Sequence, residues 1–235
     1  MKTLAVASTT LVLAGGAASA SIVLAFGSNS NTTNAQLTGA SGTATLDFSD
    51  DADGVLVKVT VENTTGDTIF GAGATASELT YFGFDLVDGA SYFGGFVGGT
   101  YLDTLNVDTS ASPFGTIDIG AGDDANFQGA GGQGGADGIP STDPNTTDMF
   151  SFILSYTGGG ATDLENAFYS AFTDDPVLLS VMRFQSVNAG EGSDKLSGPD
   201  VSQPGAPVPL PAAGWMLIAG IGGLVAMKRR KAANA

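Results

Sequence analysis

The chain has 235 residues, of which 43% are hydrophobic and 14% are charged, so it is long enough for one domain with a packed core. It contains neither cysteine nor histidine, which excludes disulfides, thiolate metal sites and the Ser-His-Asp and Cys-His classes of enzyme. All 24 acidic residues lie between residues 47 and 200, where only Lys58, Arg183 and Lys195 oppose them, and the resulting net charge of −21 excludes binding to nucleic-acid phosphates.

The first segment, residues 1–20, has the pattern of a signal peptide. A lysine gives a positive start, residues 4–14 are an apolar stretch, and Ala18 and Ala20 place small side chains at the −3 and −1 positions of a cleavage site. We therefore expect signal peptidase to remove this segment and to leave Ser21 as the first residue of the mature chain.

Residues 21–200 show the two-residue periodicity of antiparallel strands. In residues 55–62 four valines fall on one face and polar side chains on the other, and residues 63–67 after them have the composition of a turn. The same reasoning predicts strands at residues 43–48, 79–87, 91–97, 101–107, 114–119, 149–156 and 177–187. Strands at this spacing indicate an all-β fold, an acidic antiparallel β-sandwich of jelly-roll-like type.

One short helix is expected within this domain. Thr162 and Glu165 have the spacing of a capping box, in which the threonine caps the first turn and the glutamate reaches back to it. Apolar side chains continue the pattern, and Pro176 ends it. The helix is therefore predicted to begin with Thr162 as its N-cap residue.

Three clustered carboxylates are the candidate metal ligands of the sequence: Asp50, Asp51 and Asp53. Ca²⁺ binds several carboxylate oxygens from one turn. The EF-hand pattern fails here, because Thr60 stands where a bidentate acid is required. We interpret the three residues as a hairpin turn, we expect no cofactor, and we keep a Ca²⁺ site as a hypothesis.

Seven aromatic side chains lie close together in the first half of the domain: Tyr81, Phe82, Phe84, Tyr92, Phe93, Phe96 and Tyr101. Exposed aromatic rings can stack on sugars, but strand alternation places most of these seven in the core. A glycosidase would need two carboxylates about 5 to 9 Å apart, and no such pair is distinguished among the 24 acids. We therefore expect a protein that is not an enzyme.

The C-terminal part consists of three consecutive segments. Residues 201–211 are a Pro-rich linker, and an uncharged apolar segment follows at residues 212–227. As a transmembrane helix these 16 residues would span about 24 Å, against a hydrocarbon core of about 30 Å. The tail at residues 228–235 is basic and should stay in the cytoplasm. Its basic cluster is Lys228, Arg229, Arg230 and Lys231.

This order of segments resembles the PEP-CTERM family of exosortase sorting signals, over about 28 residues. It is most similar to the branch that has Val-Pro-Leu-Pro-Ala in place of Pro-Glu-Pro, here Val208, Pro209, Leu210, Pro211 and Ala212. The resemblance implies recognition by a membrane-embedded exosortase, cleavage near the motif, and release or transfer to the cell surface. It also implies an association with the exopolysaccharide and biofilm systems of Gram-negative bacteria.

These observations predict an exported, exosortase-processed structural protein of the cell surface or extracellular matrix, anchored transiently in the inner membrane. The alternative is a carbohydrate- or Ca²⁺-binding surface module. The expected partners are signal peptidase, an exosortase, the membrane before processing, and extracellular polysaccharide.

Overall fold

Two antiparallel sheets and one helix make up the part of the chain that the structure, a computed structural model, describes: residues 21–123, 138–142, 145–174, 178–190 and 192–203. These residues belong to one folded unit. Within them, no helix has both the length and the apolar character needed to cross a membrane. The predicted signal peptide, the sorting motif, the apolar segment and the basic cluster lie outside the described residues.

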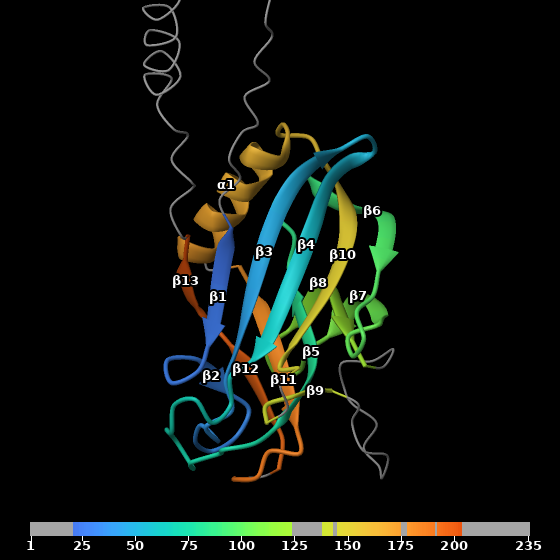
Figure 1. Cartoon of the computed structure of the whole chain (residues 1–235). Coiled ribbons are helices and arrows are strands. Elements are labelled where there is room, and N and C mark those ends of the chain that lie inside the picture. Colours follow the sequence, from blue (N-terminus) through green and yellow to red (C-terminus); the bar gives the residue numbers. More distant parts are fainter. Residues whose placement is uncertain (1–20, 124–137, 143–144, 175–177, 191, 204–235) are drawn as a thin grey trace, which may run out of the picture. The chain divides into compact units, whose positions relative to one another are not determined.

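Sheet A contains six strands (Figure 1). In spatial order they are β13 (Asp200–Ser202), β1 (Ile22–Phe26), β3 (Gly42–Asp51), β4 (Gly54–Asn63), β10 (Thr147–Tyr156) and β6 (Ala90–Val97). Val23 of β1 pairs with Ser202 of β13, so the first strand of the described chain lies beside the last strand. Both ends of the described chain therefore leave from neighbouring strands at one side of this sheet.

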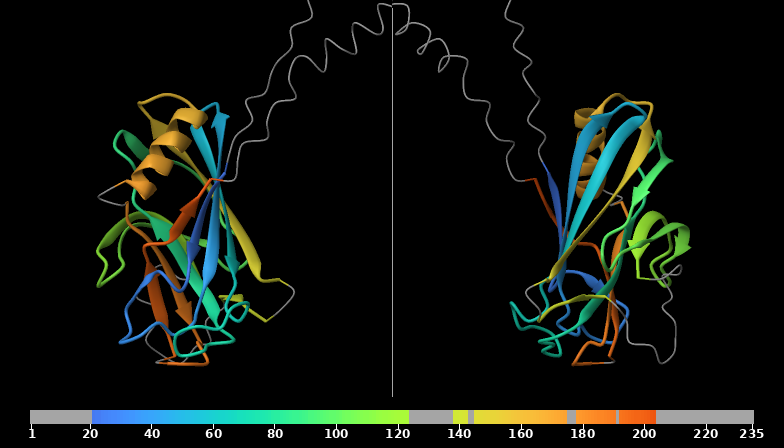
Figure 2. Two further views of the ribbon diagram at one scale, coloured as in Figure 1. Left: turned by 90° about the vertical axis from the view of Figure 1, so that its left-hand side faces the viewer. Right: turned by 45° about the vertical axis from the view of Figure 1, so that its right-hand side comes forward.

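Sheet B is formed mainly by later segments of the chain. Its order is β2 (Asn31–Thr32), β12 (Asp194–Ser197), β11 (Ser180–Gln185), β5 (Glu78–Phe84), β8 (Thr116–Gly122) and β7 (Thr104–Ser110), and β9 (Ile139–Pro140) also pairs with β5. Figure 2 shows the two sheets as separate layers. The prediction of an all-β antiparallel sandwich is confirmed.

The alternation seen in the sequence defines which face of sheet A is buried. Val55, Val57, Val59 and Val61 of β4 are at most 2% exposed, and the alternate polar residues of the strand face outward. Strand β10 repeats the pattern with its phenylalanines inside. Burial of each such side chain contributes about 1.5 to 3 kcal/mol, so these two strands form the centre of the fold.

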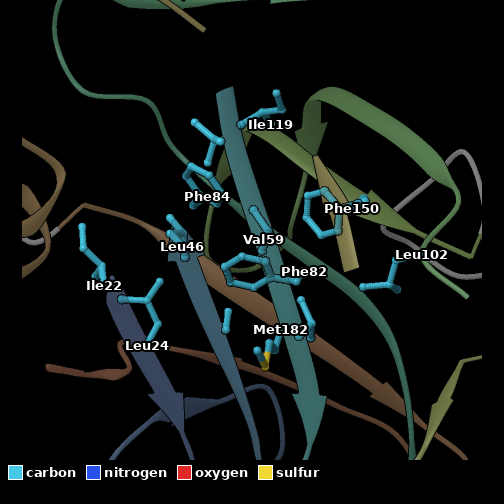
Figure 3. Packing of buried hydrophobic residues seen from close by; sticks show 14 of the residues in the cluster. Ile22, Leu24, Leu46, Val59, Phe82, Phe84, Leu102, Ile119, Phe150 and Met182 are labelled. Carbon is cyan, nitrogen blue, oxygen red and sulfur yellow. The ribbon is translucent and has the colours of Figure 1, made fainter. Parts of the chain in front are cut away.

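The core lies between the inner faces of the two sheets (Figure 3). Sheet A contributes Phe150, whose neighbour Phe152 has its ring 6.3 Å from Phe84 of sheet B. Sheet B also contributes Phe82 and Met182, which are fully buried. Phe82 and Phe84 pack edge-on or tilted against their aromatic neighbours, whereas Phe150 and Phe152 stack.

The helix α1 (Ala161–Thr173) is present, but its predicted start is wrong. Its N-cap residue is Gly160, whose N–H donates to Asp163 at 3.2 Å, so Thr162 lies inside the first turn. Glu165 does not reach back to the helix start; it is buried and accepts a hydrogen bond from Gln203 at 2.9 Å. The capping acceptor comes instead from β3, because Asp50 accepts the N–H of Ala161.

Packing of α1 against sheet A explains why this helix is stable in a β-rich domain. The ring of Phe168 lies 5.6 Å from that of Phe48 in β3 and 5.7 Å from that of Phe84 in β5. Phe172 stacks beside it at 5.9 Å. The helix therefore extends the core at the end of sheet A where β3 finishes (Figure 1).

Candidate functional site

The three candidate metal ligands lie at the hairpin between β3 and β4. Asp51 pairs with Gly54 across the two strands, and its carboxylate accepts the N–H of Asp53 at 3.0 Å, as in a tight turn. Asp50 is engaged at the start of α1. Among the described residues, no three acidic side chains converge on a point where they would hold a metal ion.

The aromatic group of the sequence is mostly core. Tyr81, Phe82 and Phe84 are at most 2% exposed, and Tyr92, Phe96 and Tyr101 pack partly buried against the core cluster. Phe93 differs from the other six, with 55% of its surface exposed. A flat platform of several aromatic rings, as a sugar-stacking surface would need, is therefore not formed by this group.

Two buried carboxylates organise loops. Asp148 accepts the backbone N–H groups of three consecutive residues, Thr100 to Leu102, at 2.8 to 2.9 Å. Asp194 accepts the hydroxyls of Thr32 and Thr38 at 2.6 and 2.8 Å, which ties the segment after β2 to β12. Carboxylates engaged in this way hold the backbone in place.

A second pair of carboxyl groups lies between β5 and β8. Burial and the adjacent charge of Asp118 raise the pKa of Asp85 to about 6. Asp118 is held by the N–H of Leu86 at 2.8 Å. One carboxyl oxygen of Asp85 is buried and has no hydrogen-bond partner among the described residues. This group therefore titrates at mildly acidic pH.

A pocket of about 300 Å³ lies at the end of sheet A where β1 and β4 finish and β3 and β13 begin. In Figure 1 this is the region at the tip of the β1 arrow. We call it the Phe70 pocket. Its lining residues are Ala25, Phe26, Gly27, Ser28, Ser41, Thr64, Asp67, Thr68, Phe70 and Asp200.

The width of the Phe70 pocket depends on Gly27. A Cβ atom added at Gly27 would lie 3.9 Å from the tip of the Phe70 ring and 3.8 Å from Cβ of Ser41. These are ordinary van der Waals separations, so a side chain fits there but would enter the pocket. A longer side chain at residue 27 would therefore lie against Phe70 and Ser41, which both line the pocket.

The polar groups of the pocket are held by neighbouring residues. Asn29 donates to the carboxylate of Asp200 at 2.9 Å, and the hydroxyl of Thr64 donates to that of Ser41 at 2.9 Å. The Asp200 bond crosses 171 positions of sequence, from the loop after β1 to the start of β13. The carboxylate of Asp200 and the hydroxyls of Thr64 and Ser41 thus each take part in a hydrogen bond within the protein.

A buried hydrogen-bond network supports one side of the pocket. Asn63, which is 2% exposed, donates to the carbonyl oxygens of Ser77 and Ile139 at 3.0 and 2.8 Å. Its own oxygen accepts the N–H of Thr65 at 3.2 Å, and the hydroxyl of Thr65 accepts the N–H of Ser41. The segment predicted from sequence as a turn does turn here, because the N–H of Asp67 donates to the carbonyl oxygen of Thr64 at 3.1 Å, and the buried network ties it to its neighbours.

The basic residues of the described domain are all placed elsewhere. Lys58 forms an exposed ion pair with Asp47 at 3.8 Å. Arg183 and Lys195 are cross-strand partners in sheet B, and burial lowers the pKa of both groups. None of the three lines the Phe70 pocket, so its electrostatic potential is set by carboxylates and hydroxyls.

Comparison with known proteins adds nothing to this geometry. No protein-family model, curated protein or solved structure matches the chain. What the pocket binds is therefore inferred from the residues that line it.

Proposed function

We propose that this chain is an exported, exosortase-processed and non-enzymatic structural component of the cell surface or extracellular matrix. The observation that carries the proposal is the tail: the motif at residues 208–212, the apolar segment at residues 212–227 and the four bases after it. With the signal peptide, these segments direct the acidic domain across the inner membrane, anchor it there for a time and then release it to the surface.

The ends of the folded domain support this proposal. Strand β1 begins at Ile22, and β13 ends at Ser202. Cleavage after Ala20 and cleavage near the motif would therefore both leave the strands of sheet A whole. We propose as well that residues 1–20 are a signal peptide, that residues 212–227 form a transmembrane helix, and that the sandwich is jelly-roll-like.

The charge and chemistry of the domain agree with a structural role. Three bases against 24 acids give residues 21–203 a net charge of −21, which keeps an exported protein soluble. The absence of histidine and cysteine removes the commonest general base and the thiol nucleophile. The buried carboxylates Asp148 and Asp194 are committed to backbone and hydroxyl partners.

The test of the proposal is the mass of the mature protein. The full chain is expressed in a Gram-negative host that has a matching exosortase, and the surface fraction is analysed by intact mass spectrometry. We expect a chain that starts at Ser21 and lacks the basic cluster. Leu210→Ala should keep the protein in the inner membrane, whereas Gln203→Ala, outside the motif, should not. An intact tail on the surface-exposed protein would overturn the proposal.

The Phe70 pocket favours a second candidate function, that of a carbohydrate-binding surface module. The pocket combines an aromatic ring, two carboxylates and several hydroxyls in a solvent-facing hollow. This function is compatible with the first, because binding to the matrix polysaccharide would retain a structural protein in the matrix.

A further inference from the structure

The Phe70 pocket carries an inference about the ligand class, which rests on the proposed surface function and deepens it. The hydroxyls of Ser28 and Thr68 both donate and accept hydrogen bonds, and the carboxylates of Asp67 and Asp200 accept them. A sugar ring offers hydroxyl groups at its edge and C–H groups on its faces. The hydroxyl groups match the polar lining, and the C–H groups match the apolar ring of Phe70.

We infer that the Phe70 pocket binds a neutral saccharide directly, without a bridging Ca²⁺ ion. Asp200 is the principal acceptor, because it lines the pocket and its carboxylate already accepts a hydrogen bond from the amide of Asn29 at 2.9 Å. Hydrogen bonds from sugar hydroxyls to this carboxylate are charge-assisted.

The charge of the pocket selects against acidic sugars. Two carboxylates line it, and no basic residue does. A uronate, sulfate or phosphate group on a ligand would meet like charges at short range, in a domain whose net charge is already −21. Neutral hexoses present only hydroxyls to the same carboxylates and meet no such repulsion.

The same lining argues for direct binding. Ca²⁺ takes six to eight oxygen ligands and favours several carboxylates at one point. The Phe70 pocket offers two carboxylates, and the described residues contain no cluster of three acidic or histidine ligands. We therefore expect binding to be unchanged when EDTA is present.

The pocket is also placed where a tethered domain can use it. Strand β1 runs from Ile22, beside the two ends of the described chain, to Phe26 at the pocket. The two residues are four positions apart along the strand, which corresponds to roughly 13 Å. If the segment beyond Gln203 holds the chain, the pocket therefore lies at the end of β1 that is further from the point of attachment.

The first experiment measures binding by the full chain, purified in detergent, to an array of neutral hexose oligosaccharides and uronate-containing oligosaccharides. EDTA is present throughout. We expect retention on one or more neutral oligosaccharides and none on the uronates. Retention on uronates alone, retention that requires Ca²⁺, or no retention at all would each overturn the inference.

The second experiment assigns the binding to the pocket by isothermal titration with the best neutral ligand. Gly27→Leu fills the space beside the ring, Phe70→Ala removes the apolar face, and Asp200→Asn removes the charged acceptor. Each should weaken binding by about tenfold or more. Phe93→Ala and Asp88→Asn, an exposed ring and an exposed acid elsewhere, should bind as the wild type does. Unchanged affinity in all three pocket variants would overturn the inference.

Two readouts separate this inference from the proposed function. Melting curves show whether each variant is folded, and any one folded pocket variant is sufficient for the comparison. Binding by purified protein does not depend on where the cell places it, so a negative titration leaves the export proposal standing. Retention of the protein inside the cell would likewise leave a positive titration standing.

Discussion

The carboxylate of Asp50 accepts the backbone N–H of Ala161 at 2.8 Å, so the end of strand β3 caps a helix that begins 111 residues later. The first N–H groups of a helix have no partner within it, and its N-terminus carries a partial positive charge. A carboxylate at that point satisfies both. The acid that sequence composition suggests as a metal ligand is thereby used to join the helix to sheet A.

Loss of this cap should lower the free energy of unfolding. Asp50→Ala is expected to cost about 1 kcal/mol in urea denaturation, because the N–H of Ala161 loses a charged acceptor. Asp53→Asn, in the same hairpin, is the matched control and should change stability by less than about 0.5 kcal/mol. Equal losses in the two variants would show that the hairpin, and not the cap, is the source.

Calcium should leave the melting temperature unchanged. One oxygen of Asp50 is engaged by α1, and one oxygen of Asp51 is engaged within its own turn. The remaining oxygens are too few for a hard cation that takes six to eight. Thermal unfolding in millimolar Ca²⁺ and in EDTA is the comparison. If Ca²⁺ raised the melting temperature and Asp51→Asn abolished that increase, the hairpin would hold the site that we expect to be absent.

Asp148 should be among the most sensitive positions of the domain. Its carboxylate accepts three backbone N–H groups from the segment Thr100 to Leu102, and hydrogen bonds to charged acceptors contribute about 1.5 to 3 kcal/mol each without adding fully. Asp148→Ala should therefore cost about 3 kcal/mol. Amide hydrogen exchange at residues 100–102 should accelerate. Met149→Ala, at the neighbouring half-exposed position, should neither lower stability to this extent nor accelerate the exchange. Exchange at residues 100–102 that stayed as slow in Asp148→Ala as in the wild type would contradict this role of Asp148.

Asp85 should make stability depend on pH in an unusual direction. Its pKa in the folded protein is about 6, above the ordinary value of 3.8, so folding favours the protonated form. The stabilising contribution is complete below about pH 4 and is lost as the pH rises through 6. Because the group is partly exposed, we expect the loss to be about 1 kcal/mol, below the full value for such a shift.

The measurement for Asp85 is the free energy of unfolding between pH 4 and pH 7. Asp85→Asn carries no charge at either pH, so the difference between wild type and this variant isolates the group. That difference should shift by about 1 kcal/mol over the range, with the wild type relatively less stable at pH 7. Asp88→Asn is the matched control and should follow the wild-type profile. A constant difference between wild type and Asp85→Asn would contradict the titration.

The central strands could be predicted because their pattern is local. Residues 55–61 of β4 and 150–154 of β10 have an apolar side chain at every second, inward-facing position, and a sheet with one buried face requires that alternation. The predicted strand at 101–107 lies at Thr104–Ser110 instead. The strand begins later than predicted because Asp148 accepts the backbone N–H groups of residues 100–102 and holds them in a loop. Asp148 lies 46 to 48 positions further along the sequence.

The outer strands and the pocket could not be predicted for a related reason. Strand β1 reads as an apolar run that continues the signal peptide, and β13 is three residues long. Strand β13 becomes recognisable through its pairing with β1, and β1 through its pairing with β13 and β3. The Phe70 pocket is likewise formed by Gly27, Phe70 and Asp200 from three segments that are far apart in sequence, so no short sequence motif predicts it.

Strand β13 has a mechanical consequence. Its first residue, Asp200, lines the Phe70 pocket, and its last, Ser202, pairs with Val23 where the chain leaves the domain. A pull between a ligand held at Asp200 and a tether beyond Gln203 would run along these three residues. The force would pass along the covalent backbone of β13 and would largely bypass the aromatic core. The residue that holds the ligand and the point where the chain leaves the domain would thus lie on one strand, so tension between them would not have to cross the sandwich.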